Sequence, residues 1–104
     1  MSVTETPVVA SALLTNEVGL HARPAVKLTQ LAKSFAATVE LALEVDGPWV
    51  DAKSPVKIMR VKAPKGTLLH FRASGSDADS AICALVDLVG RGFDENAGEG
   101  VDHA

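Results

Sequence analysis

The stretch TVELALEV, residues 38–45, alternates between apolar side chains and polar or small ones. Successive side chains of a β-strand point to opposite faces, so this alternation predicts a strand with its apolar residues, at positions 39, 41, 43 and 45, on one buried face. The turn sequence Asp46-Gly47-Pro48 follows, and residues 49–52 can return alongside as a short strand. We therefore predict an antiparallel hairpin over residues 38–52.

Helical spacing flanks this hairpin on both sides. Apolar residues recur at i, i+3, i+4 and i+7 within residues 22–35, and Pro24 fits the first turn, which predicts a helix over about residues 22–34. Ser54-Pro55 combines a preferred N-cap residue with a proline at the first helical position, so a short helix through about Val61 is expected. A last helix follows Ser76 or Asp77 and ends near Gly90 and Gly92.

Two further strands complete the pattern. The segment of residues 8–14 is short, consists mostly of apolar or small residues, and is followed by a loop sequence, which predicts a strand. Residues 68–74 also predict a strand, with Leu69, Phe71 and Ala73 on one face. The order of elements is then strand, helix, strand, strand, helix, strand, helix. Four strands with one apolar face each, and helices to cover that face, predict an α+β open-faced sandwich.

Composition limits the class of protein. The chain has 104 residues, fits one domain over residues 1–95, and carries no apolar stretch near the roughly 20 residues that span a bilayer. Its N-terminal residues lack the basic start of a secretory signal, so we expect a cytoplasmic protein without membrane insertion. The lone Cys83 excludes an internal disulfide, and we expect it to pack in the core. Residues 96–104 are typical of a disordered acidic tail.

The charges are unevenly distributed along the chain. Residues 53–72 hold six lysines and arginines and no acidic residue, although the whole chain carries a net charge of −3. A sequence pI near 5.5 argues against nucleic-acid binding. The basic segment is either a solvated face or a surface that steers an acidic protein partner.

The stretch GLHARPA, residues 19–25, places His21 where a loop becomes a helix. The first turn of a helix leaves N–H groups without intrahelical acceptors and carries the positive end of the macrodipole, so it stabilises a bound phosphate. Imidazole is a nucleophile near neutral pH, and the arginine fork of Arg23 matches phosphate oxygens. A histidine at a helix start is more often a cap or surface residue, so these features alone leave both interpretations open.

The run GLHARPA after a first strand, together with the later Lys53-Ser54 and Lys65-Gly66, resembles HPr, the histidine-containing phosphocarrier family of the phosphoenolpyruvate-dependent sugar phosphotransferase system. The resemblance covers about residues 8–93. It implies four antiparallel strands with three helices on one face. It also implies that His21 is phosphorylated on Nδ1, that Arg23 and the N–H groups of Ala22 and Arg23 stabilise the phosphate, and that no metal or organic cofactor is needed.

The resemblance also implies partners. Such a carrier takes phosphate from enzyme I, gives it to enzyme IIA domains, and is expected to be a monomer without independent enzymatic activity. Lys57 and Arg60 match a helix that contacts partners. Ser54 matches a serine that an HPr kinase phosphorylates in some lineages, although Pro55 departs from the usual residues after it, as Val18 does ahead of the histidine.

Three alternatives stay beside the carrier hypothesis. A regulatory docking module of the same fold, in a nitrogen-type or carbon-regulatory branch, would act by protein binding alone. An unrelated small α+β ligand-binding domain would need a glycine-rich loop that the sequence lacks. A metal site built from His21, His70 and His103 is disfavoured, because His70 falls in a strand and His103 in the tail.

Overall fold

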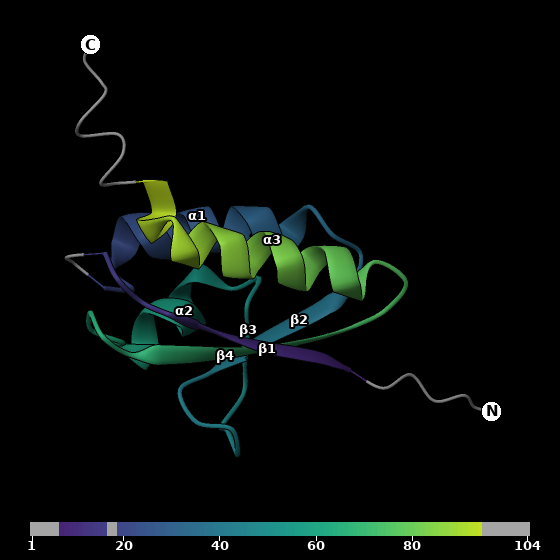
Figure 1. Ribbon diagram of the computed structural model, residues 1–104, viewed down its shortest axis with the longest axis horizontal. Coiled ribbons are helices and arrows are strands. Elements are labelled where there is room, and N and C mark those ends of the chain that lie inside the picture. The colour runs from purple at the N-terminus through teal and green to yellow at the C-terminus, as the bar shows by residue number, and fades with distance from the viewer. Residues whose placement is uncertain (1–6, 17–18, 95–104) are drawn as a thin grey trace, which may run out of the picture.

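The computed structural model describes residues 7–16 and 19–94. In chain order the elements are β1 (Val8–Leu13), α1 (Ala22–Lys33), β2 (Thr38–Ala42), β3 (Val50–Asp51), α2 (Pro55–Val61), β4 (Leu68–Ser74), α3 (Ala78–Gly90) and a 3-10 turn, η1 (Gly92–Asp94) (Figure 1). This order confirms the predicted sequence of strands and helices. Val18 and the expected tail at residues 96–104 lie outside the described residues.

The four strands form one antiparallel sheet in the order β1-β4-β2-β3. Strand β4 is central and pairs with β1 through residues such as Phe71, opposite Ala10, and with β2 through the same Phe71, opposite Leu41. Both hairpin strands are antiparallel, as predicted. The sheet therefore has β4 and β2 in its middle, and the edge strand β1 lies beside β4 although the two are far apart in the sequence.

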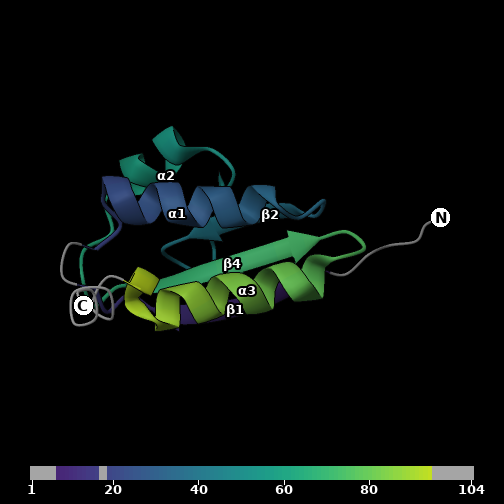
Figure 2. The ribbon, with the colours of Figure 1, turned by 90° about the horizontal axis from the view of Figure 1, so that it is seen from above.

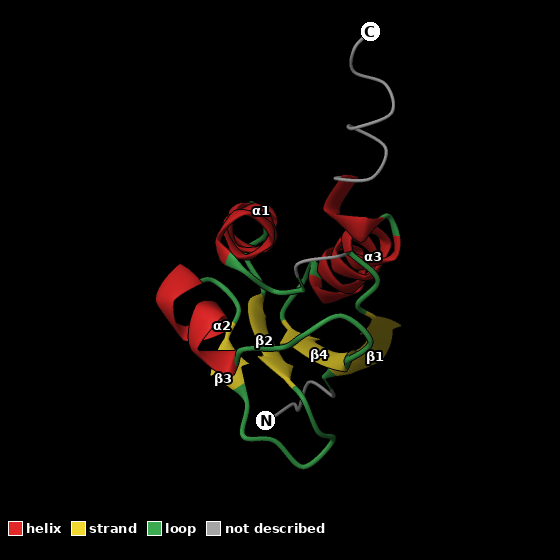
Figure 3. Ribbon diagram, turned by 90° about the vertical axis from the view of Figure 1, so that its left-hand side faces the viewer, coloured by secondary structure: helices red, strands yellow, loops and turns green. Residues whose placement is uncertain are grey.

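The helices cover one face of the sheet. Helices α1 and α3 lie side by side and run in opposite directions, with α2 on the other side of α1 (Figures 2 and 3). The other sheet face is left without helices, so the predicted open-faced sandwich is confirmed. The start of α1 and the end of α3 consequently lie at the same end of the molecule.

The core fills the space between the sheet and the helices. Residues of β4 alternate as expected, with Leu69, Phe71 and Ala73 buried beneath the helices. Leu28 of α1 and Leu85 of α3 are also fully buried and pack into the same apolar cluster. Burying large apolar side chains is the main source of stability in a domain of this size.

The strand predicted over residues 38–45 is too long. It ends at Ala42, because β3 offers only two residues for pairing and Gly47 N–H bonds back to Glu44 O at 2.8 Å, which begins the turn. Leu43 and Val45, expected to be buried, are 37% and 70% exposed. The alternation continues in the sequence beyond the point where a neighbouring strand is available.

Two other expectations about packing are corrected or extended. Cys83 is exposed, not in the core, because it lies outside the apolar stripe of α3. Phe93, beyond the helix end, is fully buried and adopts a left-handed backbone with φ of 58°.

None of the helices within residues 7–16 and 19–94 is both long and apolar enough to cross a membrane.

Asp77, the residue before α3, ties this helix to the far end of α1. Its carboxylate accepts hydrogen bonds from the N–H groups of Ala36 at 2.9 Å and Ala37 at 2.8 Å, which follow α1. The side chain was expected as a possible cap of its own helix, but it makes no capping bond there. It instead fixes the connection between α1 and β2.

We predict that Asp77 makes stability sensitive to acid. The hydrogen bond from the Ala36 N–H lowers the pKa of the Asp77 carboxyl from its ordinary value of 3.8, and the bond from the Ala37 N–H lowers it further by a smaller amount. The stabilisation is therefore fully present above pH 3.8 and is lost as the pH falls through the lower pKa of the folded protein. Asp77→Asn should lower the urea midpoint at pH 7, and its difference from the unsubstituted protein should shrink toward pH 2.

Asp79→Asn is the matched control, because it removes the same charge from the first turn of α3. Its urea midpoint should stay close to that of the unsubstituted protein across the same pH range. Equal losses at pH 7 in the two variants would show that charge at the helix start, and not the two hydrogen bonds, gives the effect.

Candidate functional site

His21 lies at the junction between a loop and α1. It is the N-cap residue, with an extended backbone (φ −94°, ψ −166°), and its carbonyl accepts the first intrahelical bond, from Ala25 N–H, at 2.8 Å. The imidazole is exposed and makes no capping hydrogen bond to the helix. Both its nitrogens are therefore free of the role that most polar N-cap side chains have.

The first turn of α1 is suited to an anion. The N–H groups of Ala22 and Arg23 precede the first intrahelical donor, so they have no acceptor within the helix, and Pro24 has no N–H at all. No acidic residue stands in this first turn, and the 12-residue helix adds the positive end of its dipole. A phosphate beside His21 would meet donors without meeting a carboxylate from this turn.

Arg23 is exposed on the same turn. Within the described part of the chain its guanidinium makes no hydrogen bond or ion pair. The five donors of its planar fork are therefore available to a group that arrives from outside. The structure brings His21, Ala22 and Arg23 together at one helix end, as the sequence predicts.

The loop ahead of His21 is fixed against a second segment, residues 62–64. Leu20 is 3% exposed, and its N–H donates to Ala63 O at 2.8 Å. Gly19 adopts φ of +67°, and a Cβ at this position would lie 2.5 Å from Ala63 O. Only glycine allows this close approach, which was not evident from the sequence beyond the presence of the glycine itself.

Asn16 is a polar residue of this loop that the sequence analysis did not single out. It is fully buried, and its side-chain Nδ2 donates to Gly19 O at 2.8 Å. The Gly19 N–H donates in turn to Asn16 O at 3.2 Å. The only signal in the sequence was an asparagine within a turn. Asparagine is common in turns because its side chain can hydrogen-bond to the nearby backbone.

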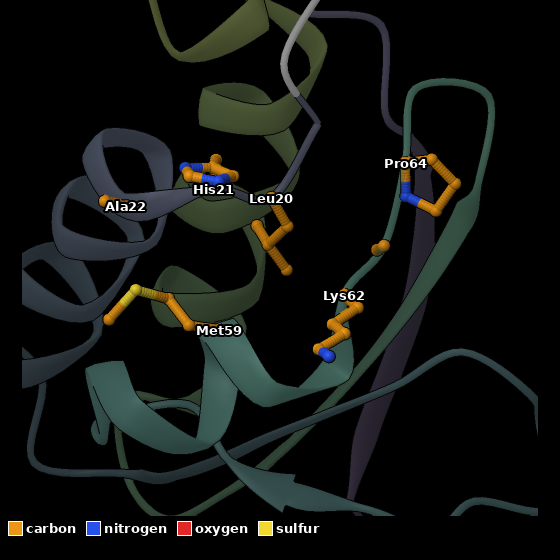
Figure 4. A pocket seen from close by; sticks show the side chains of 7 residues that line it. Leu20, His21, Ala22, Met59, Lys62 and Pro64 are labelled. Carbon is orange, nitrogen blue, oxygen red and sulfur yellow. The ribbon is translucent and has the colours of Figure 1, made fainter.

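A pocket adjoins the imidazole. Its walls come from the start of α1 and from the end of α2 with the segment after it (Figure 4). The lining residues are Leu20, His21, Ala22, Met59, Lys62, Ala63 and Pro64. Most of these are apolar, and the lining also contains Lys62, a cationic residue whose backbone is left-handed with φ of 56°.

Helix α2 presents the other residues that were singled out. Ser54 is its N-cap, and its hydroxyl accepts from Lys57 N–H at 3.3 Å, which confirms the predicted cap. Ile58 is buried, whereas Lys57 and Arg60 are exposed. Of this helix, Met59 lines the pocket beside His21. Phosphorylation of Ser54 stays a prediction.

The other histidines are not gathered at this site. His70 lies within β4, and its Nδ1 is 2.8 Å from the hydroxyl of Ser11 on the paired strand β1. His103 lies outside the described residues. Among the residues that the structure describes, no three side chains of His, Cys, Asp or Glu are grouped so as to hold a metal ion.

This chain is similar to known proteins over most of its length. The family model described as "PTS HPr component phosphorylation site" matches residues 9–91. Phosphocarrier protein NPr of Escherichia coli (strain K12) is 35% identical over 83 residues, which are 80% of this chain and 91% of that protein. Phosphocarrier protein HPr of Pseudomonas aeruginosa is 39% identical over 80 residues, covering 77% and 88%.

A solved structure agrees with the fold. The crystal structure of HPr-C-His from Thermoanaerobacter tengcongensis is 36% identical to this chain and has a TM-score of 0.78. The match covers 85% of this chain and 97% of that one. The sheet with helices on one face is therefore shared with a protein whose sequence has diverged at about two positions in three.

We predict that Gly19→Ala destabilises the protein and disturbs the start of α1. A Cβ would enter the space of Ala63 O and oppose the left-handed backbone, at a cost of about 1 to 3 kcal/mol. Gly66→Ala is the control, because Gly66 also has a positive φ, of +94°, but a Cβ there meets nothing within 4 Å. Urea unfolding should show a larger loss for Gly19→Ala. Equal losses would mean that the backbone angle matters and the contact with Ala63 does not.

Proposed function

This chain belongs to the HPr family of phosphocarrier proteins, and on that premise we propose that His21 accepts a phosphoryl group from phosphorylated enzyme I and passes it to enzyme IIA domains. The observation that carries the proposal is the exposed imidazole at the start of α1, unused as a cap and beside two N–H groups that have no acceptor within the helix. The phosphoryl group derives from phosphoenolpyruvate. The protein acts as a carrier and not as an independent enzyme.

The transfer is a substitution at phosphorus. The lone pair of His21 Nδ1 forms the new bond to phosphorus while the bond to the donor group on enzyme I breaks, and a proton on Nε2 leaves Nδ1 free to attack. The N–H groups of Ala22 and Arg23 stabilise the charge on the phosphoryl oxygens, and the helix dipole adds to this. The Arg23 guanidinium approaches the same oxygens from the surface of the helix.

The partner supplies the remainder of the reaction. In-line transfer needs the donor and acceptor atoms to be aligned, which only contact between the two proteins achieves. The apolar pocket between α1 and α2 and the exposed cations Lys57 and Arg60 offer a surface for that contact. Since one exposed site must meet successive partners, we propose that residues 1–95 act as a monomeric carrier domain in the cytoplasm.

A nitrogen-type branch is the second candidate. The similarity to an NPr as well as to an HPr supports it. In this case the acceptor would serve regulation and not sugar uptake, while His21 would keep the same chemistry. The two candidates differ in which enzyme I and which enzyme IIA domain exchange phosphate fastest with this chain.

We predict that enzyme I, Mg²⁺ and phosphoenolpyruvate add one acid-labile phosphate to the purified protein, because a phosphorus–nitrogen bond to imidazole hydrolyses in acid. Intact mass before and after mild acid treatment measures this. His21→Ala should accept none, whereas the control His70→Ala should accept phosphate normally. Phosphate that persists in His21→Ala, or that survives acid, would contradict the assignment of His21.

We also predict that Lys57→Glu combined with Arg60→Glu raises the apparent KM for this protein in transfer from enzyme I, with little change in kcat. Rim charges act mainly on the encounter of two proteins, and the effect should weaken as salt is added. Lys33→Glu, at the opposite end of α1, is the control and should leave KM unchanged. An unchanged KM in the double variant at low salt would remove α2 from the partner surface.

A further inference from the structure

We propose that Asn16 is a positioning residue for phosphoryl transfer, which fixes the backbone ahead of His21 by holding the carbonyl of Gly19. The inference rests on the proposed function, in which His21 is the phosphoryl acceptor. Within the described residues, Asn16 makes no hydrogen bond to the imidazole and does not line the pocket, so we infer that it acts through the loop and not on the phosphate itself.

The peptide unit between Gly19 and Leu20 is held at both of its polar groups. Its carbonyl accepts from Asn16 Nδ2 at 2.8 Å, and its N–H donates to Ala63 O, also at 2.8 Å. The next peptide leads directly into His21. The plane of one peptide is thus fixed from two sides, by a side chain of the preceding loop and by the backbone of a distant segment.

Glycine makes this restraint necessary. Gly19 lies in the left-handed region at φ of +67°, and a residue without Cβ has access to more backbone conformations than any other. The contact with Ala63 restrains the N–H side of the peptide and leaves the carbonyl side to Asn16. Without the side-chain bond, the carbonyl of Gly19 could rotate, and the direction of entry into α1 would change with it.

The burial of Asn16 argues that its carboxamide has this use. The residue is fully buried beside the apolar core, and within the described part of the chain its Oδ1 accepts no hydrogen bond. Burying an unsatisfied acceptor is unfavourable, so a leucine of similar size would be expected here if the position only filled space. The donor Nδ2, bonded to Gly19 O, is the part of the side chain that a leucine cannot replace.

Phosphoryl transfer makes this restraint consequential. Displacing a reacting group by about 1 Å can cost on the order of 100-fold in rate, because the attacking atom must lie in line with the bond that breaks. The imidazole has no capping bond to hold it, so its position follows from the backbone on either side. Helix α1 fixes one side, and the clamped Gly19–Leu20 peptide fixes the other.

The test compares Asn16→Leu with Thr29→Val. Thr29 lies on α1, is 2% exposed, and carries the other buried side-chain oxygen, Oγ1, without a partner among the described residues. Each variant replaces a buried polar residue by an apolar one of similar size, but only the first removes a bond to the loop of His21. Phosphoryl transfer from phosphorylated enzyme I is measured for both variants at a temperature well below their thermal unfolding midpoints.

We expect kcat for Asn16→Leu to fall by about 10- to 100-fold with KM changed less than twofold, and Thr29→Val to match the unsubstituted protein. A purely structural role would lower the unfolding midpoint and leave kcat of the folded fraction unchanged. Normal kcat in folded Asn16→Leu would overturn the inference and leave the function of His21 intact. Absence of phosphate on the unsubstituted protein would overturn both.

A second measurement tests the inference even if Asn16→Leu fails to fold, because it uses the unsubstituted protein. In the unsubstituted protein, NMR should detect a scalar coupling across the hydrogen bond between Asn16 Nδ2 and the carbonyl carbon of Gly19, with slow exchange of that side-chain amide. Rapid exchange of the amide without such a coupling would overturn the inference directly, since no clamp would then exist.

Discussion

Two hydrogen bonds hold the Gly19–Leu20 peptide, which leads into the start of α1. Leu20 is buried, its N–H bonds Ala63 O, and the preceding carbonyl bonds Asn16, so the chain enters the helix in one direction. His21 is the N-cap residue with its imidazole outside the helix, and the N–H groups of the first turn, which have no acceptor within the helix, follow directly after it. The candidate site thus consists of a helix end, and its geometry is inherited from the backbone that leads into that helix.

The rest of the fold keeps α1 in place. Lys27 donates to Phe93 O at 2.7 Å beyond the end of α3, and near the other end of α1 Lys53 donates to Phe35 O at 2.9 Å. Asp77 holds the two amides that follow. The buried face of the helix packs on the sheet through Leu28. A site on a helix restrained at both ends suits a carrier, because each partner must meet the same geometry without a prior rearrangement.

The features that the sequence predicted correctly are those that depend on neighbouring residues. The alternation in residues 68–74, the Ser54-Pro55 cap and the helix start at His21 were all evident, because each depends on residues close in the sequence. The length of β2 was not, since it depends on how many residues β3 pairs with it. The role of Asn16 in the loop needed the fold as well, because its meaning depends on Ala63, 47 positions later, holding the opposite end of one peptide. Cys83 was misassigned although the stripe of α3 already left it outside.

In the proposed mechanism, a phosphoryl group on His21 is bound by the first turn of α1. Two-dimensional ¹H–¹⁵N NMR and ³¹P NMR of the protein, recorded before and after phosphorylation by enzyme I, can detect this binding. We expect phosphate on Nδ1 of His21, with large shifts confined mainly to the amides of Ala22 and Arg23 and their neighbours. Phosphate on another residue, or phosphate on His21 that leaves those two amides unmoved, would contradict it.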